Sequence, residues 1–262
     1  MSGTHRAATE RSQRVFAGGS RQSSRILERG LHAQVVHTLG RDIVDGTLAT
    51  GQALIPDDLC SRFAVSRSVI RESLRALESL GMVSARPQVG TRVSAEENWD
   101  LLNPQVVLWR GEGTQYLRQM HELLELRLGV ESAAAELATQ RITAEQVDAL
   151  ASAAEAMAAA AQAQDAEGFL EADVSFHDIL LRSSGNAIMA QFADTVGAVL
   201  RTRSGDTGHT IHDRTGRSIA NHRQLAAALR DRDADAARRW ARTIVQETLT
   251  EFSDRTPRAA SL

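Results

Sequence analysis

Helical periodicity runs through most of this chain and constrains its fold more than any other feature. Beyond residue 115, apolar residues recur three and four positions apart in every long segment, and none alternates like a half-buried strand. The helices predicted from this pattern span 115–138, 144–163, 166–183, 187–204, 216–232 and 234–253. Amphipathic helices without a sheet bury their apolar stripes against one another. The C-terminal part is therefore predicted to be an all-α helical bundle.

The N-terminal part shows a different and shorter arrangement. The expected elements are a helix over 31–44, a helix over 57–63, a helix over 67–80 with Ser66 as its N-cap, and two strands over 82–86 and 91–94. Three helices followed by a β-hairpin form the layout of a winged helix-turn-helix domain. The predicted fold class is thus mainly α, with a winged helix-turn-helix followed by a helical bundle.

The third of these N-terminal helices carries a stripe of arginines beside its apolar stripe. Arg67, Arg71 and Arg75 are four residues apart, so they lie along one side of the helix. In a major groove, arginine pairs with guanine, and the hydroxyls of Ser66 and Ser68 can reach phosphates or base edges. The alternative is a solvated face whose charge nearby glutamates offset. We favour DNA binding because the helix spacing, the arginines and the hairpin occur together.

The distribution of charge supports this interpretation. Residues 1–95 contain 13 Arg and 8 Asp or Glu, and residues 96–262 contain 17 Arg and 25 Asp or Glu, so the net charge of −3 is the sum of +5 and −8. A basic N-terminal part joined to an acidic remainder indicates that the first part meets a polyanion.

Cysteine content and hydropathy restrict the location of the chain. The single cysteine, Cys60, excludes a disulfide framework and a thiolate zinc cluster. No apolar run is long enough to cross a bilayer, and the N-terminal segment lacks the apolar block of a signal peptide. We therefore expect a cytoplasmic protein with no membrane partner.

The sequence around the arginine stripe resembles a known family. Residues 65–78, VSRSVIRESLRALE, and residues 81–83, GMV, are similar to the recognition-helix motif of GntR-family regulators. The residues that this resemblance places on DNA are Arg67, Ser68 and Arg71, with Gly90 near the wing tip by the minor groove. Many members carry a base-reading arginine before the turn. Asp57 stands at the corresponding position here, which indicates a different operator.

Three polar residues interrupt apolar stripes of the predicted bundle. Asp173 and His177 lie one turn apart on the apolar face of the 166–183 helix, and His222 lies on that of the 216–232 helix. A buried carboxylate needs a partner, and Asp and His at i and i+4 can bind one metal ion. Two histidines and one carboxylate leave positions open for an oxygen ligand. The alternative for each histidine is a hydrogen-bonded core residue.

Arg127 also falls on an apolar stripe, in the 115–138 helix. An arginine that faces a bundle interior either pairs with Glu or Asp or binds a ligand carboxylate through its planar guanidinium. The residues alone leave both interpretations open.

These inward polar positions resemble the FCD effector domain of the FadR-type branch of the GntR family. The similar elements are residues 125–127, 173–177, 185–186 and 221–225. The resemblance implies a divalent ion, often zinc, held by Asp173, His177 and His222. It also implies a small carboxylate effector, with Arg127, Asn186 and Ser218 as the effector-binding residues.

The resemblance also shows a departure from the metal-binding members. They use a fourth ligand, a histidine, and that position falls at or near Ile244 in this sequence. The missing histidine and the connector from Trp99 to Trp109 are similar to the galactonate-type branch, whose members repress sugar-acid operons.

We therefore predict a chain with several parts. They are a mobile leader over 1–28, a winged helix-turn-helix DNA-binding domain over 29–95, a linker over 96–114, a helical effector-binding and dimerisation domain over 115–254, and a tail over 255–262. In the linker, Trp99 and Trp109 are expected to seat one domain against the other.

The predicted function is a homodimeric repressor that leaves its double-stranded DNA operator when a small carboxylate, in particular a sugar acid, binds together with the metal. One alternative is a regulator whose sensor holds the carboxylate without metal. Another is a metal-dependent enzyme in which Asp173, His177 and His222 activate water. We favour a regulator without catalytic residues, because no further acid or base stands beside the three and an enzyme would leave the winged helix unexplained.

Overall fold

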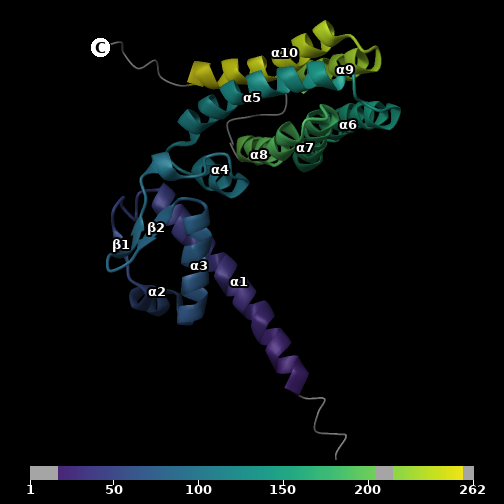
Figure 1. Cartoon of the computed structure of the whole chain (residues 1–262). Helices are drawn as coiled ribbons and strands as arrows, with labels where there is room; N and C mark the ends of the chain where they lie inside the picture. The colour runs from purple at the N-terminus through teal and green to yellow at the C-terminus, as the bar shows by residue number, and fades with distance from the viewer. Residues whose placement is uncertain (1–16, 205–214, 256–262) are drawn as a thin grey trace, which may run out of the picture. The chain divides into compact units, whose positions relative to one another are not determined.

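The computed structural model describes residues 17–204 and 215–255, which fall into two compact units, Met1–Trp99 and Asp100–Leu262 (Figure 1). Residues 256–262 of the predicted tail and residues 205–214 lie outside the described residues. The boundary between the units falls within the predicted linker.

The first unit is a winged helix-turn-helix, as predicted. Its elements are α1 (Ala17–Val44), β1 (Ala53–Leu54), α2 (Pro56–Phe63), α3 (Arg67–Ser79), β2 (Val83–Arg86), β3 (Gly90–Val93) and the 3-10 turn η1 (Glu96–Asn98). The strands form an antiparallel sheet in the order β1-β3-β2, with Val83 opposite Val93 and Arg86 opposite Gly90. The two-residue strand β1 was not predicted, since so short a segment has no period.

The core of this unit is built from the apolar stripes that the sequence predicts. Its fully buried side chains include Leu39, Ile70, Leu77 and Met82. Gly81 ends α3 with a positive φ of 72°, and a Cβ there would lie 1.9 Å from the backbone oxygen of Asn98. Only glycine satisfies both the conformation and the close approach.

Helix α1 begins within the segment predicted as a leader. Residues 17–28, predicted to belong to a mobile segment, are helical and continuous with the 31–44 helix. Once a helix is nucleated, each further residue gains one hydrogen bond while only one residue loses its conformational freedom. A helix can therefore extend beyond its apolar pattern. Residues 1–16 lie outside the described part of the chain.

The second unit is all helical over the residues described. Its helices are α4 (Pro104–Gly111), α5 (Tyr116–Ala138), α6 (Ala144–Gln162), α7 (Ala166–Ser183), α8 (Ala187–Ser204), α9 (Thr215–Arg230) and α10 (Ala234–Arg255). Helices α5 and α10 lie side by side, and α7 contacts α6, α8 and α5 (Figure 1). Each of the six predicted bundle helices is present. None of the described helices combines the length and apolar character needed to cross a bilayer.

Helix α4 corrects the predicted linker. It packs against α8 and α5, and its Val107 joins an apolar cluster with Met120 and Phe252. Trp109 is buried within this second unit, whereas the indole nitrogen of Trp99 donates to the carbonyl of Ser94 in the first. Within the described residues, each tryptophan thus has a place in its own unit.

Candidate functional site

The recognition helix α3 begins where the sequence predicts. The hydroxyl of Ser66 accepts a hydrogen bond from the backbone N–H of Val69 at 3.4 Å, which caps the helix. The hydroxyls of Ser66 and Ser68 are 2.8 Å apart. Both serines are exposed at the N-terminal end of α3, where backbone N–H groups and hydroxyls can meet phosphate oxygens.

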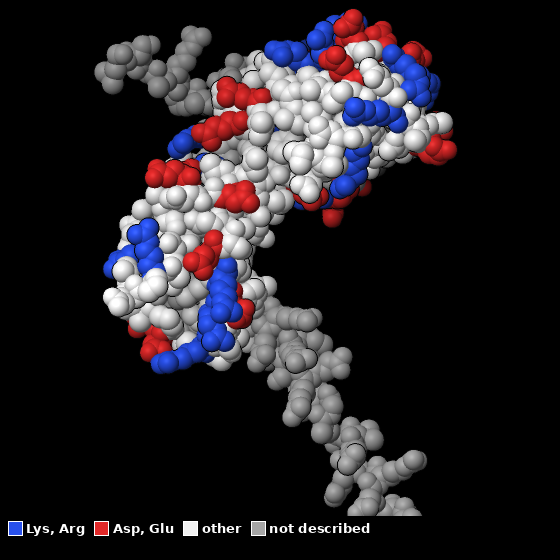
Figure 2. Space-filling model, viewed as in Figure 1, with Lys and Arg blue, Asp and Glu red and all other residues white. Residues whose placement is uncertain are grey.

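The predicted arginine stripe lies on the surface of α3. The side chains of Arg67, Arg71 and Arg75 are 77%, 67% and 64% exposed, while the opposite face of the helix is buried. Figure 2 shows basic side chains gathered over this helix. Glu72 lies 2.9 Å from Arg75 and 3.8 Å from Arg71, so it offsets part of the charge, as the solvated-face alternative requires. The long basic side chains nevertheless remain available to DNA.

Gly90 lies at the tip of the predicted wing. It follows the turn over 87–89, opens β3 with a φ of +79°, and has nothing within 4 Å of the position of a Cβ. Its neighbour Val89 is 50% exposed. This geometry presents backbone and small side chains, which suits approach to a minor groove.

In the helical unit, the structure brings together the three residues predicted to bind metal. Asp173, His177 and His222 are all buried, and each offers a ligand atom within 4.8 Å of the others. The Oδ1 atom of Asp173 lies 3.4 Å from Nε2 of His177 and 3.2 Å from Nε2 of His222. A tetrahedral ion with bonds of about 2.0–2.1 Å separates its ligand atoms by roughly 3.3 Å. The observed spacing therefore fits a small divalent cation.

The orientation of the two imidazoles also fits a metal. Nδ1 of His222 lies 2.7 Å from the carbonyl oxygen of Ser218 and donates to it, and Nδ1 of His177 lies 2.6 Å from Oε2 of Glu131. Metal-binding histidines in proteins use such contacts to fix the tautomer and ring orientation. Both Nε2 atoms are thereby directed at Asp173.

Three buried atoms of this cluster make no hydrogen bond of acceptable geometry in the described residues. One is Nδ1 of His177, which has only its ion contact with Glu131. The other two are Oδ1 of Asp173 and Nε2 of His222, which lie close to each other. Buried polar atoms are rarely left in this state, and a cation between them would satisfy both. The donor set of two imidazoles and one carboxylate suits zinc.

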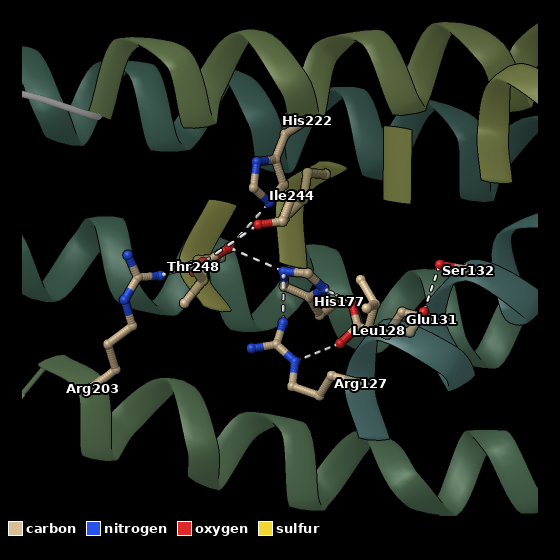
Figure 3. A network of polar contacts seen from close by, with 10 residues as sticks. Arg127, Leu128, Glu131, Ser132, His177, Arg203, His222, Ile244 and Thr248 are labelled. Carbon is tan, nitrogen blue, oxygen red and sulfur yellow. Dashed lines mark hydrogen bonds and ion pairs between the residues drawn. The ribbon is translucent and has the colours of Figure 1, made fainter. Parts of the chain in front are cut away.

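Glu131 is a central residue of the site that the sequence analysis missed. It lies one helical turn after Arg127 on α5, and its side chain is 1% exposed. Its Oε1 accepts from Nε of Arg127 at 2.5 Å while its Oε2 faces His177 (Figure 3). The signal that could have found it is the i,i+4 spacing from an inward arginine, which needs a buried counter-charge.

Charge coupling shifts the pKa values of this cluster. Burial alone would raise the pKa of Glu131, but the charges of Arg127 and His177 lower it to about 2. Burial alone would lower the pKa of His177, but the Glu131 charge and contacts with Asp173 raise it to about 9. Despite burial, contacts with His177 and His222 hold the pKa of Asp173 well below its usual value. The carboxylates are therefore charged, and His177 without a metal is a cation.

Arg127 takes the structural role that its position in the sequence left open, and its geometry is compatible with the other. It is buried and paired with Glu131, which is the structural role. Its Nη2 also lies 3.4 Å from Nε2 of His177, so the guanidinium reaches the atom that faces the metal position (Figure 3). Among the described residues Nη1 has no partner, and its two N–H groups remain available to an anionic ligand.

The structure does not bring every predicted effector residue to this cluster. The side-chain oxygen of Asn186 accepts from the backbone N–H groups of Ile188 and Met189 at 2.9 and 3.3 Å, which caps α8. The structure gives Asn186 this capping role, and its place in the effector site stays a prediction. Ser218 is half-buried and takes part through its carbonyl, which orients His222.

Ile244 provides no ligand in the position where the resemblance implies a fourth one. It is 9% exposed on α10 and belongs to the same apolar cluster as Phe176, whose ring contacts that of His222 edge-on at 4.7 Å. Among the described residues, the side of the cluster facing Ile244 is therefore apolar. Among the residues that the structure describes, the side chains placed to hold an ion are Asp173, His177 and His222.

Comparison with known proteins gives a consistent result for both units. Residues 31–93 match the bacterial regulatory proteins of the gntR family, and residues 122–247 match the FCD domain. The galactonate operon transcriptional repressor of Escherichia coli K12 is 30% identical over 222 residues, covering 84% of this chain and 96% of that protein. The E. coli K12 transcriptional repressor NanR is 28% identical over 183 residues, covering 70% and 68% of the two chains.

Solved structures agree with the fold. The Listeria monocytogenes protein Lar, described as controlling expression of the agr system, superimposes with a TM-score of 0.60 at 19% identity, covering 86% of this chain and 97% of Lar. E. coli McbR/YncC gives a TM-score of 0.50 at 20% identity, covering 86% and 98%. At these identities the similarity concerns the architecture alone.

Proposed function

This chain belongs to the gntR family of bacterial regulatory proteins and carries an FCD domain, and from that premise we propose that it represses a sugar-acid operon. It is a DNA-binding transcriptional regulator and not an enzyme. We propose further that it acts as a homodimer and leaves its operator when a small carboxylate binds the helical unit. The single observation that carries this proposal is the convergence of Arg127, Asp173, His177 and His222 in one buried cluster.

The chemistry of the cluster favours a hydroxy acid as effector. Asp173, His177 and His222 would hold a divalent ion, which supplies open coordination positions for a carboxylate oxygen and a neighbouring hydroxyl. The free N–H groups of Arg127 can bind the carboxylate at the same time. Galactonate, the acid for which the E. coli relative is named, has both groups on adjacent carbons.

Release from DNA requires that the effector prefer one of two states of the dimer. In the bound state, the two α3 helices match the spacing of the operator half-sites, and in the other state they do not. To move such an equilibrium from 1:99 to 99:1, the effector must bind one state more tightly than the other by about 5.5 kcal/mol. Charge-assisted contacts with a buried arginine and a metal are strong enough to contribute on this scale.

Replacing Arg67 by alanine is expected to weaken operator binding by about 1–3 kcal/mol and to relax the preference for one base pair. The reason is that Arg67 is an exposed arginine at the N-terminal end of α3, where recognition helices meet base edges. Fluorescence anisotropy with operator duplexes substituted one base pair at a time measures both effects. Unchanged discrimination would show that α3 is not the recognition helix.

Replacing Arg127 by alanine is expected to leave operator binding intact but to abolish release by the effector, because the variant loses the guanidinium that receives the carboxylate. The test is titration of operator-bound protein with galactonate and other aldonic acids. Arg201→Ala, which removes a partly exposed arginine of α8, is the control and should release normally. If Arg127→Ala also releases normally, the effector binds elsewhere.

A further inference from the structure

The arginines of the recognition helix face carboxylates of their own domain. Arg67 contacts Asp57, and Arg75 and Arg71 approach Glu72. These side chains are mostly exposed, and ion pairs of this kind contribute little to the stability of a fold. A negative charge on a surface that meets phosphates also weakens binding to DNA in general. The acidic partners therefore call for an explanation in terms of recognition.

The pair of Asp57 and Arg67 differs from the other two because it joins two helices. Asp57 lies in the first turn of α2, and Arg67 is the first residue of α3. Both carboxylate oxygens contact a single nitrogen of the guanidinium: Nη2 lies 2.7 Å from Oδ1 and 2.9 Å from Oδ2. Among the described residues, Nε and Nη1 of Arg67 have no hydrogen-bond acceptor, so their N–H groups are available to DNA.

The position of Asp57 is fixed by its helix. Pro56 precedes it at the start of α2, a negative charge in the first turn suits the helix dipole, and its carbonyl accepts from the hydroxyl of Ser61 at 3.0 Å. Leu59, two residues later, is 6% exposed and anchors α2 in the core. The carboxylate is thus presented from a short, well-anchored element.

We propose that Asp57 is a positioning residue that sets operator specificity through Arg67. By holding Nη2, it restricts the guanidinium before DNA arrives and leaves the remaining N–H groups to pair with the acceptors of a base edge. The negative charge of Asp57 also disfavours conformations in which the guanidinium of Arg67 turns away from it to contact a phosphate. Asp57 therefore increases the discrimination between operator and other DNA, while it lowers affinity for DNA of any sequence.

This inference rests on the proposed operator binding and predicts an effect opposite to that of a simple DNA contact. Removing a residue that touches DNA weakens binding. Removing the charge of Asp57 instead strengthens binding to unrelated DNA, because Arg67 becomes free to contact a phosphate. The dependence of log K on log salt should then become steeper by about 0.9, the contribution of one phosphate contact.

The test uses the full chain with Asp57→Asn, which keeps the size of the side chain and removes its charge. Asp58→Asn is the matched control, since Asp58 is the next residue of the same turn and, in the described part of the chain, its carboxylate makes no ion pair with an arginine of α3. Binding is measured by fluorescence anisotropy over a range of salt concentrations. The probes are a duplex selected from random-sequence DNA by the wild-type protein and a scrambled duplex of the same composition.

For Asp57→Asn we expect tighter binding to the scrambled duplex and a fall of about tenfold in the ratio of the two affinities. Asp58→Asn should change both affinities by the same factor. Equal ratios in the two variants would overturn the proposal. Arg67→Ala, measured in parallel, separates this failure from that of the proposed operator contact: if Arg67→Ala alone loses discrimination, the helix reads DNA and only the role of Asp57 is refuted.

A double variant, Asp57→Asn with Arg67→Ala, tests whether Asp57 acts through Arg67. If it does, the double variant should discriminate no less than Arg67→Ala alone, since the group to be positioned is already absent. A further loss in the double variant would mean that Asp57 contacts the base itself, which would also overturn a positioning role.

Discussion

Glu131→Ala is expected to reduce the free energy of unfolding by about 3–5 kcal/mol, the cost of removing one partner from a buried ion pair. Glu131 has a side-chain exposure of 1% and is the counter-charge of Arg127 and of protonated His177. Without it, the buried Arg127 would lose its ion-pair partner, and His177 would lose the charge that most raises its pKa. Urea denaturation of the full chain, followed by helical circular dichroism, measures the loss.

The control for this variant is Glu136→Ala on the same helix. Glu136 is 52% exposed, and its ion contact with Arg238 is at 4.0 Å, so the change should cost less than about 1 kcal/mol. Glu131→Gln, which keeps the shape and removes the charge, should resemble Glu131→Ala rather than the control. Equal losses at positions 131 and 136 would show that the buried cluster does not depend on this charge.

Zinc is expected to stabilise the chain, and its effect should grow as the pH rises. Without metal, the pKa of His177 is raised to about 9 from 6.5. The stabilisation of the fold that comes from its positive charge is therefore complete below pH 6.5 and is lost as the pH rises through 9. This loss is on the order of 3 kcal/mol. Zinc must displace the same proton, so its affinity should rise roughly tenfold per pH unit across this window.

Thermal unfolding of chelator-treated protein, with and without buffered zinc, measures both effects. At a free zinc concentration 100 times the Kd, the stabilisation should be about 2.7 kcal/mol. Asp173→Asn should remove the zinc effect, whereas Asp178→Asn, which changes a partly exposed carboxylate of α7 that pairs with Arg182, should keep it. A zinc effect that is independent of pH, or that survives Asp173→Asn, would contradict binding at this cluster.

Periodicity predicted most of the fold because long amphipathic helices leave little ambiguity. The predicted bounds of the 166–183 and 187–204 helices coincide with α7 and α8. The pattern failed for short elements: β1 has two residues, and α4 begins at Pro104 in a segment that reads as a connector. In both cases tertiary packing, which no local pattern reports, decides the structure.

Part of the candidate site could be predicted from the sequence, and the reasons for the success and for the omissions are physical. Asp173, His177 and His222 stood out because polar residues on apolar stripes need partners. Glu131 was missed because Arg127 was read without the carboxylate one turn after it. Asn186 was predicted to bind the effector, and the sequence analysis did not consider that an asparagine directly before a helix is also a typical N-cap, the role in which the structure shows it.

We propose above all that a carboxylate effector and a divalent ion act together at the Asp173–His177–His222 cluster to free the operator. The most direct test is titration of the operator complex with galactonate, comparing protein stripped of metal with the same protein reloaded with zinc. We predict release at a galactonate concentration at least about tenfold lower after reloading, with no zinc effect in Asp173→Asn. Identical release curves for stripped and reloaded wild-type protein would contradict the claim.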